Sequence, residues 1–191
     1  MTKTKKILIA VAVLFVCLIG GLCVAISLQP STFSVQRSAI MGAPPAEVFA
    51  QVNDLKAWDA WSPWKKLDPN AKMTISDPSA GKGATIAWAG NKEIGEGKMT
   101  ILDSKPDELV DLEQAFIKPF EGKARLVFTF AAEEDGTKVT WKMHGTNDFL
   151  GKAICMFMDM DSTLGTPFDE GLANMKAVVE NSDAASAAAT P

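Results

Sequence analysis

The side chains that could perform nucleophilic or metal chemistry are few and scattered in this sequence. His144 is the only histidine, and Cys155 is the only cysteine beyond residue 28. A zinc site needs three or four nitrogen or sulfur ligands, and no segment matches the Gly-x-Ser-x-Gly pattern of a serine hydrolase. Asp159 and Asp161 could share a hard cation, but two carboxylates without a glycine-bearing loop fit a solvated helix end better. We therefore expect no metal site and no cofactor.

Two carboxylates, Asp111 and Glu113, are the candidates for acid–base catalysis if the protein is an enzyme. Residues two apart on a strand share a face, so both point either into a pocket or into solvent. His144 lies on a predicted strand that also holds Trp141 and Met143, which occupy the alternate positions. If that apolar face lines the core, His144 faces outward.

A different set of residues could bind an apolar ligand. The chain has five tryptophans, ten phenylalanines, nine methionines and no tyrosine. Aromatic rings and adaptable methionines can line an apolar cavity, but they also fill ordinary cores. The segment 61–64 either closes one end of the fold or forms a lip at the mouth of such a cavity. The candidates for the cavity lining are Trp61, Trp64, Trp88, Met99, Phe116, Phe128, Phe130, Trp141, Met143, Phe157, Phe168 and Leu172.

The elements that must position these residues follow a simple order. A helix with proline in its first turn is expected from Pro45, and apolar spacing predicts helices over 149–160 and 168–179, separated by a break at Gly165-Thr166-Pro167. Strands are predicted over 33–41, 72–76, 83–89, 95–103, 108–117, 123–131 and 138–144. All connections within the sheet are short, which favours an antiparallel meander. A final helix that covers a curved sheet can leave a cavity between the two.

The segment from Ile7 to Leu28 carries no charged residue. A bilayer core of about 30 Å needs about 20 such residues in a helix. Three lysines precede the segment, and the next cation is Arg37, so the positive-inside rule places the N-terminus in the cytoplasm. A cleaved signal peptide is the alternative, but its apolar region would have only about 7–15 residues. The segment is therefore interpreted as an uncleaved anchor.

Charge and length limit what the rest of the chain can be. Three of the 19 Lys and Arg residues precede Ile7, which leaves 16 against all 23 Asp and Glu, a net charge of about −7. This charge argues against nucleic acid as a partner. The expected organisation is a cytoplasmic N-terminus over 1–6, a transmembrane helix over 7–28, a spacer over 29–32, one domain over 33–180 and a disordered tail over 181–191.

Several motifs carry a resemblance to a known family. They are Ala43-Pro44-Pro45-Ala46-Glu47-Val48-Phe49, Trp58-x-x-Trp61-Ser62-Pro63-Trp64, Gly83-x-x-x-x-Trp88-x-Gly90-Asn91, Thr137-x-Val139-x-Trp141 and Gly171-Leu172. On these motifs, the segment from Thr32 to Glu180 resembles the START-like (SRPBCC) superfamily, and within it the polyketide cyclase/dehydrase and lipid-transport group. The resemblance implies an α+β helix-grip fold, a curved antiparallel sheet of about seven strands wrapped on a long C-terminal helix. The family has no shared catalytic motif to carry over to this chain.

The sequence therefore favours a single-pass membrane protein whose soluble domain lies in the periplasm or outside the cell. The hypothesis is a non-catalytic binding protein for a hydrophobic small molecule or lipid. Two alternatives stay open: an enzyme of the polyketide cyclase/dehydrase type, and a tethered interaction domain of a membrane complex. The identity of the ligand and the oligomeric state are not encoded in any recognisable pattern.

Overall fold

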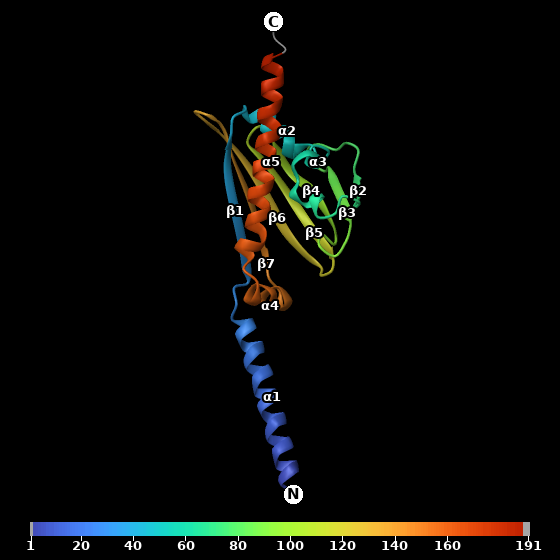
Figure 1. Ribbon diagram of the computed structural model, residues 1–191, viewed down its shortest axis with the longest axis vertical. Coiled ribbons are helices and arrows are strands. Elements are labelled where there is room, and N and C mark those ends of the chain that lie inside the picture. Colours follow the sequence, from blue (N-terminus) through green and yellow to red (C-terminus); the bar gives the residue numbers. More distant parts are fainter. Residues whose placement is uncertain (1, 189–191) are drawn as a thin grey trace. The chain divides into compact units, whose positions relative to one another are not determined.

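The computed structural model describes residues 2–188 of the chain (Figure 1). The chain divides into two units. We call the first the helical unit, which comprises Met1–Phe33 and Thr146–Asp159, and the second the sheet unit, which comprises Ser34–Gly145 and Met160–Pro191. Almost all of the sheet and the long C-terminal helix belong to the sheet unit.

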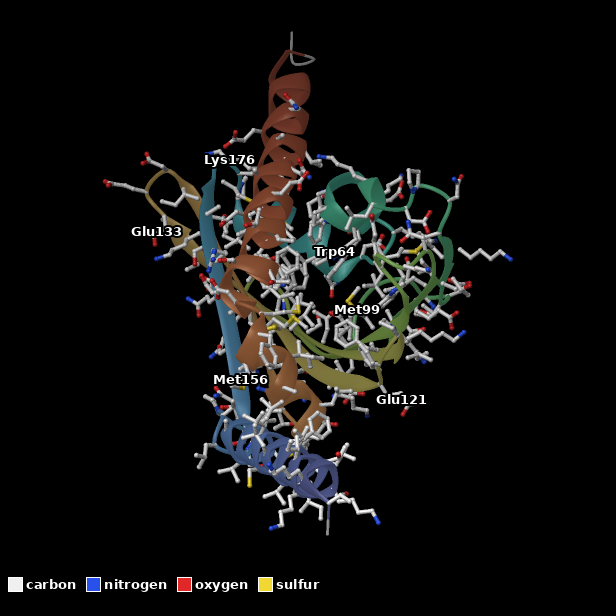
Figure 2. All side chains as sticks on the ribbon, turned by 60° about the horizontal axis from the view of Figure 1, so that its bottom comes forward. Trp64, Met99, Glu121, Glu133, Met156 and Lys176 are labelled. Carbon is white, nitrogen blue, oxygen red and sulfur yellow. The ribbon has the colours of Figure 1, made fainter. Side chains whose placement is uncertain are left out.

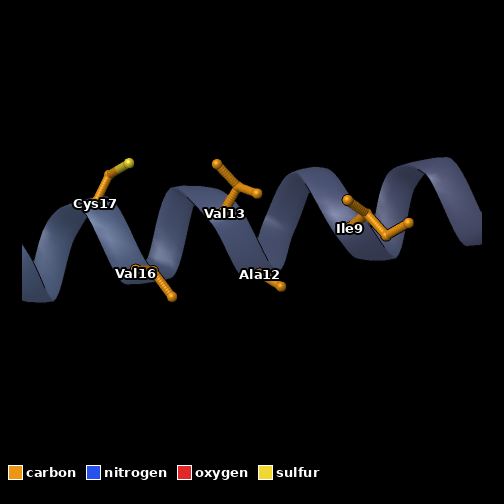
Figure 3. A pocket seen from close by; sticks show the side chains of 5 residues that line it. All are labelled: Ile9, Ala12, Val13, Val16 and Cys17. Carbon is orange, nitrogen blue, oxygen red and sulfur yellow. The ribbon is translucent and has the colours of Figure 1, made fainter.

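The helical unit holds helix α1 (Lys3–Ser27) and helix α4 (Phe149–Phe157). α1 is long and apolar enough to cross a membrane, a property that a signal sequence near an N-terminus shares. A shallow apolar hollow of about 290 Å³ runs along it, lined by Ile9, Ala12, Val13, Val16 and Cys17 (Figure 3). The spacing of these five residues places them on one face of the helix. The predicted apolar helix is therefore present, and its side chains are largely exposed.

Seven antiparallel strands form one sheet in the order β1-β7-β6-β5-β4-β3-β2. The predicted meander is confirmed, with the first strand placed beside the last. The strands are β1 (Thr32–Met41), β2 (Lys72–Ile75), β3 (Thr85–Ala89), β4 (Glu96–Lys105), β5 (Leu109–Lys118), β6 (Gly122–Glu133) and β7 (Gly136–Thr146).

The predicted Asp-Gly hairpin joins β6 to β7. Glu133 pairs with Gly136 at its end, and Gly136 has a φ of +130°, a conformation that favours glycine. A Cβ at this position would lie 2.1 Å from the carbonyl oxygen of Met41, at the end of β1. Glycine therefore allows both the turn and the close approach of β1.

Four helices complete the sheet unit: α2 (Pro45–Asn53), α3 (Trp58–Trp61), the 3-10 helix η1 (Pro63–Lys66) and α5 (Met160–Ala188). Figure 1 shows α5 lying along the inner face of the curved sheet. The buried side of α5 repeats at helical spacing, with Phe168, Leu172, Met175 and Val179 at 1% exposure or less. This arrangement is the helix-grip fold that the resemblance implies.

The break between the last two helices was predicted at the wrong place. α4 ends at Phe157 and α5 begins at Met160, so the break falls at Met158–Asp159, and Pro167 lies inside α5. A proline removes one backbone hydrogen bond from a helix. The turns on either side of Pro167 are both tied to Arg37, through Asp161 and Asp169, and these contacts support a continuous helix.

The C-terminal end of α5 also differs from expectation. The helix continues past Glu180 to Ala188, through a stretch rich in alanine, the strongest helix former. Residues 181–188 of the predicted tail are thus helical, and residues 189–191 lie outside the described residues.

Candidate functional site

An aromatic cluster lies between the sheet and α5, centred on Trp141. Its ring stacks on Phe168 of α5 at 4.1 Å between centroids and on Phe128 of β6 at 4.9 Å. Trp61 and Trp64 meet the same ring edge-on, each at 5.7 Å. Offset stacking and edge-to-face contacts are the favoured geometries for aromatic pairs. We call these five residues the aromatic cluster.

Glycine brings α5 close to this cluster. A Cβ at Gly171 would lie 2.9 Å from Cζ3 of Trp141 and 3.2 Å from Cδ of Pro63. The helix therefore packs directly against the indole ring because residue 171 has no side chain. Pro63 belongs to the Trp-Ser-Pro-Trp segment, so that segment packs into the fold rather than extending from it.

The tryptophans differ in how their indole N–H groups are satisfied. Nε1 of Trp58 donates to the carbonyl oxygen of Val52, and Nε1 of Trp61 donates to that of Gln51, each at 2.9 Å. Nε1 of Trp141 is buried and has no hydrogen-bond partner within residues 2–188. Buried polar groups are nearly always paired in folded proteins, so the free donor of Trp141 is an exception.

A second group of residues continues the inner face of the sheet away from the cluster. We call Trp88, Met99, Gln114 and Phe116 the half-buried patch. Trp88 and Phe116 flank Gly97 in the register of β3, β4 and β5, and Met99 pairs with Gln114. Three of these side chains are partly exposed, and Met99 is 9% exposed. The patch is thus a partly accessible apolar surface with one amide group. Met99 is labelled in Figure 2.

The structure distributes the twelve predicted lining residues over four places. Five form the aromatic cluster, and Leu172 and Met143 are buried nearby on the inner surfaces of α5 and β7. Three belong to the half-buried patch. Phe130 packs instead against Phe49 of α2 at 5.6 Å, and Phe157 is 72% exposed on α4, in the helical unit.

The predicted acid–base candidates lie on the outer face of the sheet. Asp111 accepts a two-point hydrogen bond from Arg125, and Glu113 accepts one from Lys123 at 3.1 Å. The hydrogen bond to Asp111 raises the pKa of Arg125, which stays charged. His144 is the register partner of Arg125 and alternates with buried Trp141 and Met143, so it also faces outward, as predicted.

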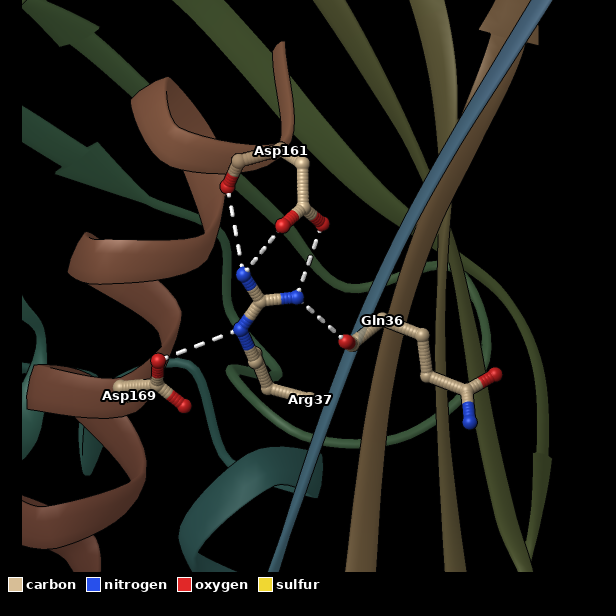
Figure 4. A network of polar contacts seen from close by, with 4 residues as sticks. All are labelled: Gln36, Arg37, Asp161 and Asp169. Carbon is tan, nitrogen blue, oxygen red and sulfur yellow. Dashed lines mark hydrogen bonds and ion pairs between the residues drawn. The ribbon is translucent and has the colours of Figure 1, made fainter. Parts of the chain in front are cut away.

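Arg37 was missed as a functional candidate, although it is a charged residue on the inner face of the sheet. It lies two and four residues from buried Val35 and Met41 along β1 and so shares their face, a pattern visible in the sequence. Its guanidinium binds Asp161 at 2.8 Å and Asp169 at 3.1 Å (Figure 4). The hydrogen bond with Asp161 raises the pKa of Arg37 and lowers that of Asp161. Both carboxylates belong to α5, so this network ties the first strand to the last helix.

Few other groups between the sheet and α5 could bind a metal ion or a polar ligand. Within the described residues, no group of three or more His, Cys, Asp or Glu side chains is arranged to hold a metal ion. A surface groove of about 500 Å³ lies outside the grip, between α3–η1 and α5. Its lining mixes both charges and amides: Asp59, Ala60, Ser62, Lys65, Lys66, Pro69, Asn174, Ala177, Val178 and Asn181.

Comparisons with known proteins agree with this architecture. The chain resembles protein CV1439 from Chromobacterium violaceum (17% identity, 79% of this chain, 99% of that one, TM-score 0.56). It also resembles the Aha1 dimer from Colwellia psychrerythraea (17% identity, 78% and 96% coverage, TM-score 0.57). The di-domain ARO/CYC StfQ from the steffimycin biosynthetic pathway is 10% identical over 80% of this chain and 52% of its own, with a TM-score of 0.58.

These structural neighbours share the fold with this chain at low sequence identity. Among curated proteins, none matches the sequence at a significant level. Residues 32–180 match the family described as polyketide cyclase / dehydrase and lipid transport. The match spans β1 to α5 and includes every strand and both groups of inner-face aromatic residues. The chain therefore belongs to the polyketide cyclase/dehydrase and lipid transport family.

Proposed function

We propose that the protein binds a hydrophobic small molecule or lipid on the inner face of its sheet, without catalysing a reaction. The observation that carries this proposal is the buried, unpartnered indole N–H of Trp141. A buried donor without an acceptor costs about 1–3 kcal/mol. A ligand that presents a carbonyl or hydroxyl oxygen to Nε1 removes that cost when it binds.

The surroundings of Trp141 favour an apolar ligand. Aromatic rings border the indole on both faces and at its edges, and the half-buried patch extends this apolar surface towards solvent. Arg37 is an ionisable side chain on the inner face, and two carboxylates already bind it. A charged ligand would find no free counter-charge there.

The position of the predicted acid–base candidates also favours binding over catalysis. Proton transfer requires a titratable side chain within hydrogen-bond reach of the reacting atom. Asp111 and Glu113 are on the opposite face of the sheet and already bind Arg125 and Lys123. We therefore keep the enzyme as the second hypothesis only.

We further propose that α1 anchors the protein in a membrane, with the N-terminus in the cytoplasm. α1 meets the length and composition required of a membrane span, and three lysines cluster at its N-terminal end. The sheet unit then lies on the periplasmic or extracellular side. A hydrophobic ligand partitions into lipid, so tethering would keep the binding site near its source.

The test is native mass spectrometry of the full-length protein in nanodiscs, offered an organic extract of membranes from the expressing cells. The wild type should retain a bound molecule. Trp141→Phe, which keeps the stacked ring and removes the donor, should weaken retention about tenfold, the equivalent of one hydrogen bond. Trp58→Phe is the matched control, because that indole N–H is paired with Val52, and it should retain the molecule normally.

Two results would overturn the binding proposal. One is a wild-type protein that never retains a molecule from the extract. The other is equal retention by wild type and Trp141→Phe. That result would mean that the indole N–H of Trp141 does not contribute to binding.

A further inference from the structure

Helix α4 presents an apolar surface that no described residue of its own unit covers. Four large side chains are exposed on it: Phe149 (52%), Leu150 (46%), Met156 (36%) and Phe157 (72%). Their spacing of one and seven residues places all four on one face of a helix. α4 contains no Asp or Glu, and none of its residues is buried. A contiguous exposed patch of this kind marks an interaction surface.

Lys152, one helical turn before Met156 at the border of this face, binds α4 to the C-terminal end of α1. Nζ of Lys152 donates to the carbonyl oxygen of Ser27, the last residue of α1, at 2.9 Å. Just before α4, the backbone N–H of Asn147 donates to Ser31, and its side-chain amide lies 3.4 Å from Sγ of Cys155. Lys152 and Cys155 are half-buried, unlike the apolar face.

These contacts fix how deep α4 lies if α1 spans a membrane. The last carbonyl groups of a helix lack intrahelical partners and carry partial negative charge, which a lysine ammonium satisfies. The apolar segment that begins at Ile7 ends at Leu28, so Ser27 marks the level at which α1 leaves the hydrocarbon core. The hydrogen bond from Lys152 to Ser27 therefore keeps α4 close to that level, at a distance no greater than the length of a lysine side chain.

We infer that α4 lies at the membrane–water interface, on the side of the membrane opposite the cytoplasm. Phe149, Leu150, Met156 and Phe157 insert among the lipid acyl chains, and Lys152 lies at the headgroups. This inference rests on the proposed anchoring by α1. Lipid is the partner that the structure favours for this face of α4. The face is close to the end of α1, and the exposed apolar side chains of α1 would themselves be covered by lipid. An apolar face of aromatic and aliphatic side chains with a lysine at its border is typical of interfacial helices.

The test measures depth in vesicles of phosphatidylcholine with a minority of phosphatidylglycerol. The full chain carries an environment-sensitive fluorophore on a single cysteine, introduced by Phe157→Cys after Cys17, Cys23 and Cys155 are replaced by alanine. Lipids with a nitroxide near the headgroup should quench this label about twofold or more relative to the same label at Ile40→Cys. Ile40 is an apolar residue of the sheet unit with 47% exposure, which makes it a matched control.

A third position separates this inference from the anchoring proposal. A label at Val13→Cys, in the middle of α1, should be quenched by a nitroxide deep in the acyl chains. Quenching at Val13 without quenching at Phe157 would overturn the interfacial helix and leave the anchor standing. No quenching at either position would overturn both. Phe149→Cys, at the other end of the same face, repeats the measurement and should respond as Phe157→Cys does.

Discussion

Arg37 lies across Gly165, so close that a Cβ at residue 165 would come within 1.9 Å of Nη2 of the guanidinium. The arginine crosses α5 there to reach Asp161 on one side and Asp169 on the other. The position of the Arg37 guanidinium, on the first strand, therefore requires that residue 165 of the last helix has no side chain.

Two glycines of α5 should respond differently to alanine. Alanine raises helix propensity by about 1 kcal/mol at either site. At Gly165, the obstructing atoms belong to the flexible end of Arg37, which can move away and give up its exposed ion pairs. At Gly171, they belong to the buried ring of Trp141, and overpacking should cost about 1–3 kcal/mol.

Denaturant unfolding checks this pair. Gly165→Ala should leave the free energy of unfolding within about 1 kcal/mol of wild type, whereas Gly171→Ala should lower it clearly. Equal effects at the two positions would contradict the close contact between Trp141 and α5.

Asp161 should make the folding stability depend on pH in the acid range. Its hydrogen bond with Arg37 lowers its pKa below the ordinary value of 3.8. Because the folded-state pKa is depressed, the stabilisation is complete above pH 3.8 and disappears as the pH falls through the folded value. Unfolding midpoints measured across this range should show the loss, and Asp161→Asn should show a smaller one.

Arg37→Met tests the origin of that pH dependence. It keeps much of the aliphatic stem and removes the guanidinium, so the pKa of Asp161 should return towards 3.8. NMR titration of the Asp161 carboxyl measures this directly. A depressed pKa that survives Arg37→Met would show that another group causes the shift.

Trp58→Phe should destabilise the protein more than Trp141→Phe. Both substitutions remove the same volume from a buried site. Trp58→Phe also leaves the carbonyl oxygen of Val52 without its donor, while Trp141→Phe removes a donor that had no partner. The difference in unfolding free energy should be about 1–2 kcal/mol in ligand-free protein. A larger loss for Trp141→Phe would contradict this expectation.

Asp111→Asn and Glu113→Gln should leave ligand retention unchanged. Both carboxylates are on the outer face, bound to Arg125 and Lys123. Asp111→Asn should cost about 1 kcal/mol of stability, because it weakens a two-point pair that is only partly exposed. Loss of binding or of any turnover in either variant would instead support the catalytic hypothesis.

The sequence was sufficient to predict local structure wherever a repeating pattern or a turn residue controlled it. The seven strands, the Asp135-Gly136 hairpin and the apolar N-terminal helix all followed from alternation, turn chemistry or length. The break before the C-terminal helix did not, because Pro167 gave a strong local signal for an end to the helix. The contacts of Arg37 with Asp161 and Asp169, which support the helix across that proline, join residues more than one hundred positions apart.

The candidate site shows the same division. Composition supplied the aromatic residues as candidates for a cavity lining, since side chains that avoid water are recognisable one at a time. Only the tertiary structure decided which rings stack, that the indole N–H of Trp141 is left without an acceptor, and that Asp111 and Glu113 face away. A buried polar group is paired or unpaired according to atoms that distant segments bring to it, and single residue types do not carry that information.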